Sequence, residues 1–221
     1  MRNILSLAVA ASSVVSAQDL LEPLVVTAAR STQDLRDVPY SADVVSSTAI
    51  REDARRSLPE TLIYTPGVLI QKTAHGHGSP FIRGFTGRRN LLLLDGVRIN
   101  NSTWRSGPVQ YWNTIDPYAR DRVEAITSQG SVLYGSDAAG GTVNAFSKSS
   151  NFMARETGQV YAGGSFLYEY RSNGRGSHIG RFEAETGMGE TFGVWLGLSL
   201  KECGDIEDSA IGLMRGTGSP E

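Results

Sequence analysis

Four consecutive leucines at positions 91–94 form a short run that is apolar at every position. Such a run suits a strand covered on both faces better than an amphipathic helix, in which polar residues would interrupt it. Asp95 and Gly96 follow, and an Asp-Gly pair between two apolar runs favours a type I′ turn, in which both central residues have positive φ. We therefore predict a hairpin in which residues 91–94 pair with residues 97–99.

Strict alternation of apolar and polar residues begins after Asn151. Segments of about ten residues with one apolar and one polar face, joined by Gly-rich turns, are typical of outer-membrane barrel strands. A soluble antiparallel sheet has the same period, so the pattern leaves both interpretations open. The apolar positions are Val160, Ala162, Phe166, Tyr168 and Tyr170, then Phe182, Ala184 and Met188 opposite Arg181, Glu183 and Glu185, and finally Phe192, Val194, Leu196, Leu198 and Leu200.

Shorter signals fill the chain between residues 38 and 150. Ser57-Leu58-Pro59-Glu60 is typical of a capping box that opens a helix over residues 58–64. Residues 72–80 and 101–113 lack periodicity and are expected to be loops, while residues 131–135 are expected to turn. Further predicted elements are a polar helix over 48–56, a helical turn opened by Asp116-Pro117, and strands over 41–45, 68–71, 81–85, 122–127 and 140–146.

Composition narrows the class of protein. The chain has 221 residues, 25 glycines, 8 prolines and 8 tyrosines, which favours strands and turns. Its net charge of −2 gives no electrostatic case for nucleic acid. The single cysteine, Cys203, excludes an intramolecular disulfide framework. Residues 1–17 carry Arg2, an apolar stretch and small residues before Gln18, which predicts an export signal peptide cleaved after Ala17; a buried N-terminal helix is the alternative.

Candidate binding residues gather in the two predicted loops. His75 and His77 would project from the same face of an extended backbone, as two metal or haem ligands would, although solvated loop histidines give the same pattern. Packing against neighbouring structure is an equal alternative for the aromatic side chains. The candidate substrate contacts are His75, His77, Trp104, Arg105, Tyr111 and Trp112. We find no nucleophile elbow, P-loop or dinucleotide fingerprint, so we predict no enzyme, catalytic residue, metal site or cofactor.

Six motifs in order between residue 24 and about residue 147 resemble the N-terminal part of TonB-dependent outer-membrane receptors. Ile126 is followed by Thr127-Ser128-Gln129-Gly130, where the family usually has Arg-Gly-Pro or Lys-Gly-Pro. The motifs are Leu24-Val25-Val26-Thr27-Ala28, which resembles a TonB box, Thr65-Pro66-Gly67-Val68, Phe81-Ile82-Arg83-Gly84-Phe85, Leu94-Asp95-Gly96-Val97, Arg122-Val123-Glu124, and Ser131-Val132-Leu133-Tyr134-Gly135 with Gly140-Gly141-Thr142-Val143-Asn144.

The resemblance implies a fold and a domain order. We expect an α+β plug domain, a small mixed sheet with short helices, followed by antiparallel transmembrane β-barrel strands whose barrel is incomplete in this chain. The place of the leucine hairpin between the motifs at 81–85 and 122–124 predicts that it is the central hairpin of the plug sheet. The expected boundaries are a signal peptide over 1–17, a TonB-box and linker segment over 18–37, a plug over 38–150 and the first barrel strands over 151–221. Even a small outer-membrane barrel needs about eight strands, so we expect a fragment, a truncated product or a plug that works without its own barrel.

The resemblance also implies a function. The family takes up scarce nutrients such as ferric siderophores, haem or cobalamin across the outer membrane of Gram-negative bacteria, and the inner-membrane TonB protein grips residues 24–28 to supply energy. Taken alone, residues 24–28 suit either β-augmentation or an ordinary first strand. A plug-only periplasmic binding or signalling module is the alternative function. The resemblance assigns structural roles to Arg83, Gly84, Asp95, Gly96, Arg122, Glu124, Gly135, Gly140 and Gly141, and we expect Arg83, Arg98, Arg122 and Glu124 to form ion pairs.

Overall fold

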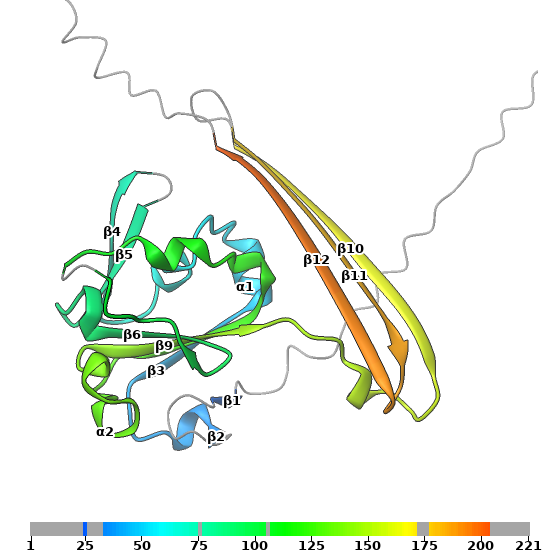
Figure 1. Ribbon diagram of the computed structural model, residues 1–221, viewed down its shortest axis with the longest axis horizontal. Coiled ribbons are helices and arrows are strands. Elements are labelled where there is room, and N and C mark those ends of the chain that lie inside the picture. Colours follow the sequence, from blue (N-terminus) through cyan, green and yellow to red (C-terminus); the bar gives the residue numbers. More distant parts are fainter. Residues whose placement is uncertain (1–23, 26–32, 75–76, 105–106, 172–176, 204–221) are drawn as a thin grey trace, which may run out of the picture.

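The computed structural model describes residues 24–25, 33–74, 77–104, 107–171 and 177–203. Two parts lie against each other (Figure 1). The N-terminal domain (residues 33–148) contains a five-stranded sheet, a two-stranded hairpin and short helices, and the long sheet (residues 160–203) contains three antiparallel strands. This agrees with the predicted order of a small mixed domain followed by alternating strands.

The N-terminal domain is built from short elements. Its strands, with β1 just before the domain, are β1 (Leu24–Val25), β2 (Gln33–Asp34), β3 (Ala42–Ser46), β4 (Val68–Ala74), β5 (His77–Ile82), β6 (Asn90–Leu94), β7 (Val97–Arg98), β8 (Arg120–Ile126) and β9 (Gly141–Ser147). Its helices are α1 (Ser47–Glu52), α2 (Ser131–Tyr134) and the 3₁₀ turns η2 (Leu35–Asp37), η3 (Pro59–Leu62), η4 (Gly87–Arg89), η5 (Tyr111–Thr114), η6 (Pro117–Ala119) and η7 (Ser136–Ala138). A last turn, η8 (Phe152–Ala154), leads to the long sheet, β10 (Val160–Arg171), β11 (Ser177–Met188) and β12 (Phe192–Cys203).

The predicted leucine hairpin is confirmed. β6 and β7 pair antiparallel with Leu94 opposite Val97. Asp95 and Gly96 have φ angles of 51° and 81°, as a type I′ turn requires. The Asp95 carboxylate also accepts hydrogen bonds from the backbone nitrogen and the hydroxyl of Ser147, both at 2.7 Å. The turn is therefore fixed both by its own backbone and by the end of β9.

The hairpin lies at the edge of the sheet, so the prediction that it is central is wrong. The strand order is β3-β8-β9-β6-β7, which places β9 in the middle. β6 pairs in parallel with β9, from Asn90 opposite Gly141 to Leu94 opposite Ala145, and only its other side is left for β7. A parallel pairing across some fifty residues leaves no local signal in the sequence.

Both faces of β6 are covered, as the leucine run predicts. Leu92 is fully buried in the main core with Trp112, Leu58 and Val143. Leu91 and Leu93 point to the opposite face, where Ala138 and Tyr134 cover them. Burying a leucine side chain completely stabilises the fold by ~1.5–3 kcal/mol, so this strand is a main source of stability for the domain.

Three local predictions need correction. Residues 72–80 are mostly strand, because β4 and β5 form a hairpin with Ile70 opposite Pro80. Residues 131–134 form the short helix α2 rather than a turn. The helix predicted over 58–64 is the 3₁₀ turn η3, which has no side-chain cap; instead, Glu60 Oε2 accepts a hydrogen bond from Arg56 N at 2.9 Å.

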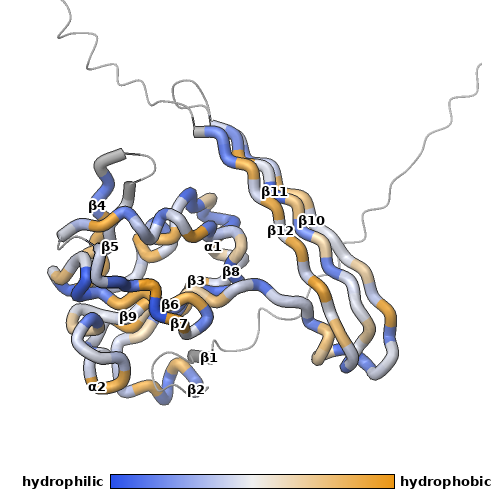
Figure 2. The backbone as a smooth tube through the Cα atoms, in the orientation of Figure 1, coloured by the Kyte–Doolittle hydropathy of each residue, from blue (hydrophilic) through white to orange (hydrophobic). Residues whose placement is uncertain are grey.

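The long sheet confirms the alternating pattern, and Figure 2 shows hydrophobic and hydrophilic residues alternating along its strands. Each strand has 12 residues, and β11 pairs along its full length with both neighbours. On one face the large apolar side chains are exposed, Phe166 by 73% and Leu200 by 69%. On the other face Arg181 and Glu183 are buried against the N-terminal domain. The sheet therefore turns its polar face inward and its apolar face outward.

Candidate functional site

The aromatic loop (residues 101–113) lies beside the β4–β5 hairpin. Val109 N donates to Ser79 Oγ at 3.1 Å, and Asn113 Nδ2 donates to the carbonyl of Gly78 at 3.1 Å. The start of the loop is held by Asn100, whose Oδ1 accepts from Leu92 N at 3.0 Å. Thus the structure brings together two segments that the sequence treats as separate candidate loops.

The candidate residues differ in accessibility. Trp112 is fully buried in the core, and Trp104 is 4% exposed. Tyr111 is half-buried and stacks on Trp104 with ring centroids 5.0 Å apart and an interplanar angle of 18°. His77 belongs to β5, whereas His75 and Arg105 lie outside the described residues. Of the three aromatic candidates, Tyr111 offers an accessible surface, while Trp112 holds the end of the loop in the core.

A buried carboxylate fixes the base of the hairpin. Glu60 of η3 is 5% exposed and forms an ion pair with Lys72 of β4. Burial favours the neutral acid, but the hydrogen bonds from Lys72 and from the Arg56 backbone outweigh it and lower the pKa of Glu60. Glu60 is therefore ionised, and its ion pair with Lys72 connects the β4–β5 hairpin to η3.

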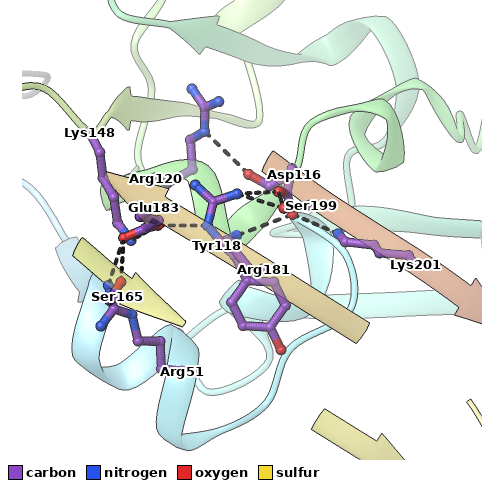
Figure 3. A network of polar contacts seen from close by, with 10 residues as sticks. All are labelled: Arg51, Asp116, Tyr118, Arg120, Lys148, Ser165, Arg181, Glu183, Ser199 and Lys201. Atoms are coloured by element: carbon purple, nitrogen blue, oxygen red, sulfur yellow. Dashed lines mark hydrogen bonds and ion pairs between the residues drawn. The ribbon is translucent and has the colours of Figure 1, made fainter. Parts of the chain in front are cut away.

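A polar network joins the N-terminal domain to the long sheet (Figure 3). Its first half centres on Asp116, the residue before η6. Asp116 Oδ2 accepts from Arg181 Nη1 of β11 at 3.0 Å and from Ser199 Oγ of β12 at 2.6 Å, and Asp116 Oδ1 accepts from Lys201 Nζ at 2.6 Å. Asp116 also caps η6 by accepting from Tyr118 N at 3.3 Å. One carboxylate thus orders its own turn and docks two strands.

The second half of the network centres on Glu183 of β11. Glu183 Oε1 accepts from Lys148 Nζ and from Arg181 Nε, each at 2.6 Å, and Arg51 Nη2 lies 3.4 Å from Oε2. Lys148 follows β9 and Arg51 belongs to α1, so two separate elements of the N-terminal domain reach the same carboxylate. Arg181 and Glu183 are 4% and 8% exposed, which makes these pairs largely desolvated.

Tyr118 extends the contact to β10. Its hydroxyl donates to Glu169 Oε2 at 2.6 Å, and its side chain is 2% exposed. Burial and the neighbouring Glu169 carboxylate raise the pKa of Tyr118, so the phenol stays protonated. Burial opposes the charged form of Asp116, but the hydrogen bonds and charges of Lys201, Ser199 and Arg181 outweigh it and lower the pKa of Asp116. Each group is held in the protonation state that its contacts require.

The sequence identified only part of this network. The alternation of β11 placed Arg181 and Glu183 on its polar face, and the Asp116-Pro117 pair predicted the capped turn. No local signal in the sequence pairs Asp116, Tyr118, Lys148 or Arg51 with strands that follow later in the chain.

A cavity of about 440 Å³ lies beside the network. It is lined by Arg51, Arg122, Lys148, Glu185 and Trp195 among others.

The residues assigned structural roles are distributed over the strands and turns of the N-terminal domain. Arg122 Nε lies 2.9 Å from Glu124 Oε1, and Arg98 Nη1 lies 3.1 Å from Asp137 Oδ2, so these ion pairs are confirmed. Arg83 is exposed and, with a φ of 52°, sits in the turn after β5 together with Gly84, so the strand predicted over 81–85 ends at Ile82. Among the described residues Arg83 does not form the expected ion pair. The others are Asp95 and Gly96 in the β6–β7 turn, Gly135 after α2, and Gly140 and Gly141 at the start of β9.

Two further properties of the described residues bear on function. No group of three or more His, Cys, Asp or Glu side chains is placed to hold a metal ion within the ranges that the structure describes. Among those same residues, none of the helices has the length and apolarity that a membrane crossing requires.

At the N-terminus, β1 pairs with β2, with Leu24 opposite Asp34 and Val25 opposite Gln33. Residues 1–17 and 26–28, which carry the predicted signal peptide and the rest of the predicted TonB box, lie outside the described residues.

Residues 34–142 match the family described as TonB-dependent receptor plug domain. The chain belongs to the TonB-dependent receptor family. Its N-terminal domain contains the plug, and the strands of the long sheet resemble the first barrel strands of TonB-dependent receptors, without a closed barrel. The members it matches are outer-membrane receptors and transporters, not enzymes.

Curated relatives match more than half of the chain. A vitamin B12 transporter, BtuB, of Vibrio vulnificus is 40% identical over 131 residues, which is 58% of this chain and 21% of the relative. The rhizobactin receptor of Rhizobium meliloti is 33% identical over 131 residues, 58% of this chain and 17% of the relative. The chain therefore spans about a fifth of the length of such relatives.

Solved structures agree on the fold. The ferripyoverdine receptor of the Pseudomonas aeruginosa outer membrane superposes with a TM-score of 0.58 at 19% identity, covering 76% of this chain and 21% of that one. The siderophore receptor PirA of Acinetobacter baumannii gives 0.56 at 20% identity, covering 78% and 26%. Because both identities are low, these structures bear on architecture alone.

Proposed function

We propose that this chain is the N-terminal part of an outer-membrane receptor that takes up a scarce nutrient of the ferric siderophore, haem or cobalamin class in an energy-dependent way. The observation that carries the proposal is the docking of the N-terminal domain on the polar face of a sheet whose opposite face is apolar and exposed. Phe166, Leu196 and Leu200 are each more than half exposed on that face, as strands in contact with lipid would be. This feature favours a membrane receptor over a plug-only periplasmic module.

The connections of the long sheet suggest how the receptor is oriented. Three residues, 189–191, join β11 to β12, and five residues, 172–176, join β10 to β11. Outer-membrane barrels have short periplasmic turns and longer extracellular loops. The Arg171 end of β10 is then the outer end. The β4–β5 hairpin rises toward this same end (Figure 1).

In this orientation the recognition surface is the outer side of the N-terminal domain. It is formed by the β4–β5 hairpin and by the aromatic loop with its half-buried Tyr111. An aromatic ring backed by a second, buried ring offers a rigid apolar surface to a large chelate or macrocycle. His77 belongs to the same hairpin, and His75 and Arg105 remain candidate contacts.

Energy would enter at the other end of the domain. We propose that TonB takes residues 24–28 as an added strand, because extended backbone can carry load through parallel hydrogen bonds. Within the described residues, Leu24 and Val25 form strand pairs with the two residues of β2, so a partner strand would have two strand pairs to displace there. The network around Asp116 and Glu183 would keep the domain attached to the long sheet while the N-terminal segment is pulled.

The test is ligand binding by the complete receptor. Purified receptor is titrated with cyanocobalamin and with ferrichrome as probes, and the variant Tyr111→Ala is compared with wild type. We expect one probe to bind and Tyr111→Ala to weaken it about tenfold, since an aromatic contact is worth ~1 kcal/mol or more beyond its buried area. Unchanged affinity in Tyr111→Ala would remove the aromatic loop from the recognition surface.

A further inference from the structure

The attachment of the aromatic loop to β5 runs through two hydroxyl groups, those of the buried Ser79 and the partly buried Thr86. Val109 N donates to Ser79 Oγ at 3.1 Å, Ser79 Oγ lies 3.1 Å from Thr86 Oγ1, and Thr86 Oγ1 donates to the carbonyl of Pro80 at 3.3 Å. Because Thr86 gives its proton to Pro80, Ser79 gives its own proton to Thr86 and keeps a lone pair for Val109. The hydrogen bonds therefore all point the same way, from the loop toward the strand.

A second attachment lies four residues further along the loop. Asn113 Nδ2 donates to the carbonyl of Gly78 at 3.1 Å and to the carbonyl of Gln110 at 3.0 Å. The first bond crosses to β5 and the second closes the turn that opens η5. The amide of one side chain thus fixes both the shape of the loop end and its distance from the hairpin.

The hydrogen bond from Val109 N to Ser79 Oγ is closed to water. Ser79 is 5% exposed and Val109 is 1% exposed. A Cβ atom on Gly78 would lie 3.3 Å from Pro59 Cβ and 3.4 Å from Asn113 Oδ1, so the loop, η3 and β5 are already in close contact. A buried backbone N–H that loses its acceptor finds no water in its place, which makes the bond from Val109 to Ser79 costly to break.

We propose that Ser79 and Asn113 are positioning residues for ligand recognition, which hold the aromatic loop on β5 so that Tyr111 and the hairpin form one preorganised surface. The proposal rests on the proposed function of this surface. Neither side chain touches the ligand. Without these two side chains, the loop would have to become ordered when the ligand binds, and the conformational entropy lost in that step would weaken the affinity.

The first test needs no ligand. Hydrogen–deuterium exchange is measured on the complete receptor for peptides that cover residues 107–113 and β5. We expect Ser79→Ala to lower the protection of both segments about tenfold, Asn113→Asp to do the same, and Ser79→Thr, which keeps the hydroxyl, to restore it. The control Ser136→Ala removes an exposed hydroxyl of η7, outside the recognition surface, which donates to Asp137 Oδ1 at 3.4 Å, and leaves both segments protected.

The second test separates positioning from general stability. Using the probe that wild type binds, cyanocobalamin or ferrichrome, we expect Ser79→Ala to weaken binding about tenfold, Ser79→Thr to restore it, and the melting temperature to stay within about 2 °C of wild type. Binding in Ser79→Ala equal to that in the control Ser136→Ala, or unchanged exchange in residues 107–113, overturns the inference. If Tyr111→Ala also leaves binding unchanged, or neither probe binds, the proposed function fails, whereas the exchange result still decides whether Ser79 holds the loop.

Discussion

Replacing Gly141 by alanine is expected to destabilise the N-terminal domain by about 3 kcal/mol, at the upper end of the usual cost of overpacking. A Cβ atom at this position would lie 2.6 Å from the carbonyl oxygen of Ile126 in β8 and 2.8 Å from Cγ2 of Ile82. The carbonyl belongs to the backbone of a neighbouring strand in the same sheet, so it cannot move away as a flexible side chain would. Relief requires β9, the middle strand of the sheet, to shift.

The matched control is Gly180→Ala in β11, where a Cβ atom would meet nothing within 4 Å. Both changes add one methyl group to a strand glycine with no positive φ. The difference in stability between the two variants is measured by urea unfolding of the complete receptor, monitored through the hydrogen-exchange protection of the β6 and β9 amides. Equal stability of the two variants would contradict the packing described for β8 and β9.

Arg181→Met is expected to weaken the docking of η6 on the long sheet by about 3 kcal/mol, because removing one partner of a buried ion pair leaves uncompensated charge. Arg181 is 4% exposed and bridges the two carboxylates of the network, Asp116 at 3.0 Å and Glu183 at 2.6 Å. Methionine fills similar space without the charge. Exchange protection of the Tyr118 and Ala119 amides should fall about a hundredfold.

Lys201→Met is the control for this prediction. It removes another cation from the same Asp116 carboxylate, but the Lys201 side chain is 27% exposed and water replaces much of what is lost. We expect a cost below about 1 kcal/mol. If Lys201→Met weakens the docking of η6 as much as Arg181→Met, the buried position of Arg181 has no special role in holding the domain.

Local sequence rules predicted the parts of the fold that local physics determines. Asp95 and Gly96 predicted the turn because a type I′ turn needs positive φ at two adjacent residues. The four leucines before it predicted a strand that is buried on both faces. The alternation in residues 160–200 predicted which side chains of the long sheet point outward, including Phe166 and Leu200. In each case the signal and the structure lie within a dozen residues of each other.

Long-range pairing accounts for what the sequence did not predict. The parallel contact of β6 with β9 places the leucine hairpin at the edge of the sheet. The partners of Arg181 and Glu183 come from α1, η6 and the end of β9, so no spacing in the sequence reveals them. These features depend on elements that meet only after the chain has folded.

The sequence did not distinguish the three aromatic candidates from one another. Trp104, Tyr111 and Trp112 look alike in the sequence, as aromatic residues of one polar loop. In the structure Trp112 fills the core, Trp104 supports Tyr111, and Tyr111 keeps an accessible face. The extent of burial distinguishes Trp112, which holds the loop in place, from Tyr111, which is accessible. That burial depends on packing against β5 and η3, which lie some thirty or more residues earlier in the chain.

Deletion of residues 24–28 from the complete receptor tests the central claim, which is that this chain couples outer-membrane ligand recognition to an energy supply through its N-terminal strand. Uptake of the bound probe, cyanocobalamin or ferrichrome, is measured in energised cells beside equilibrium binding to the same cells. We predict that the deletion abolishes uptake and leaves binding unchanged. Uptake that continues at the wild-type rate would contradict the account.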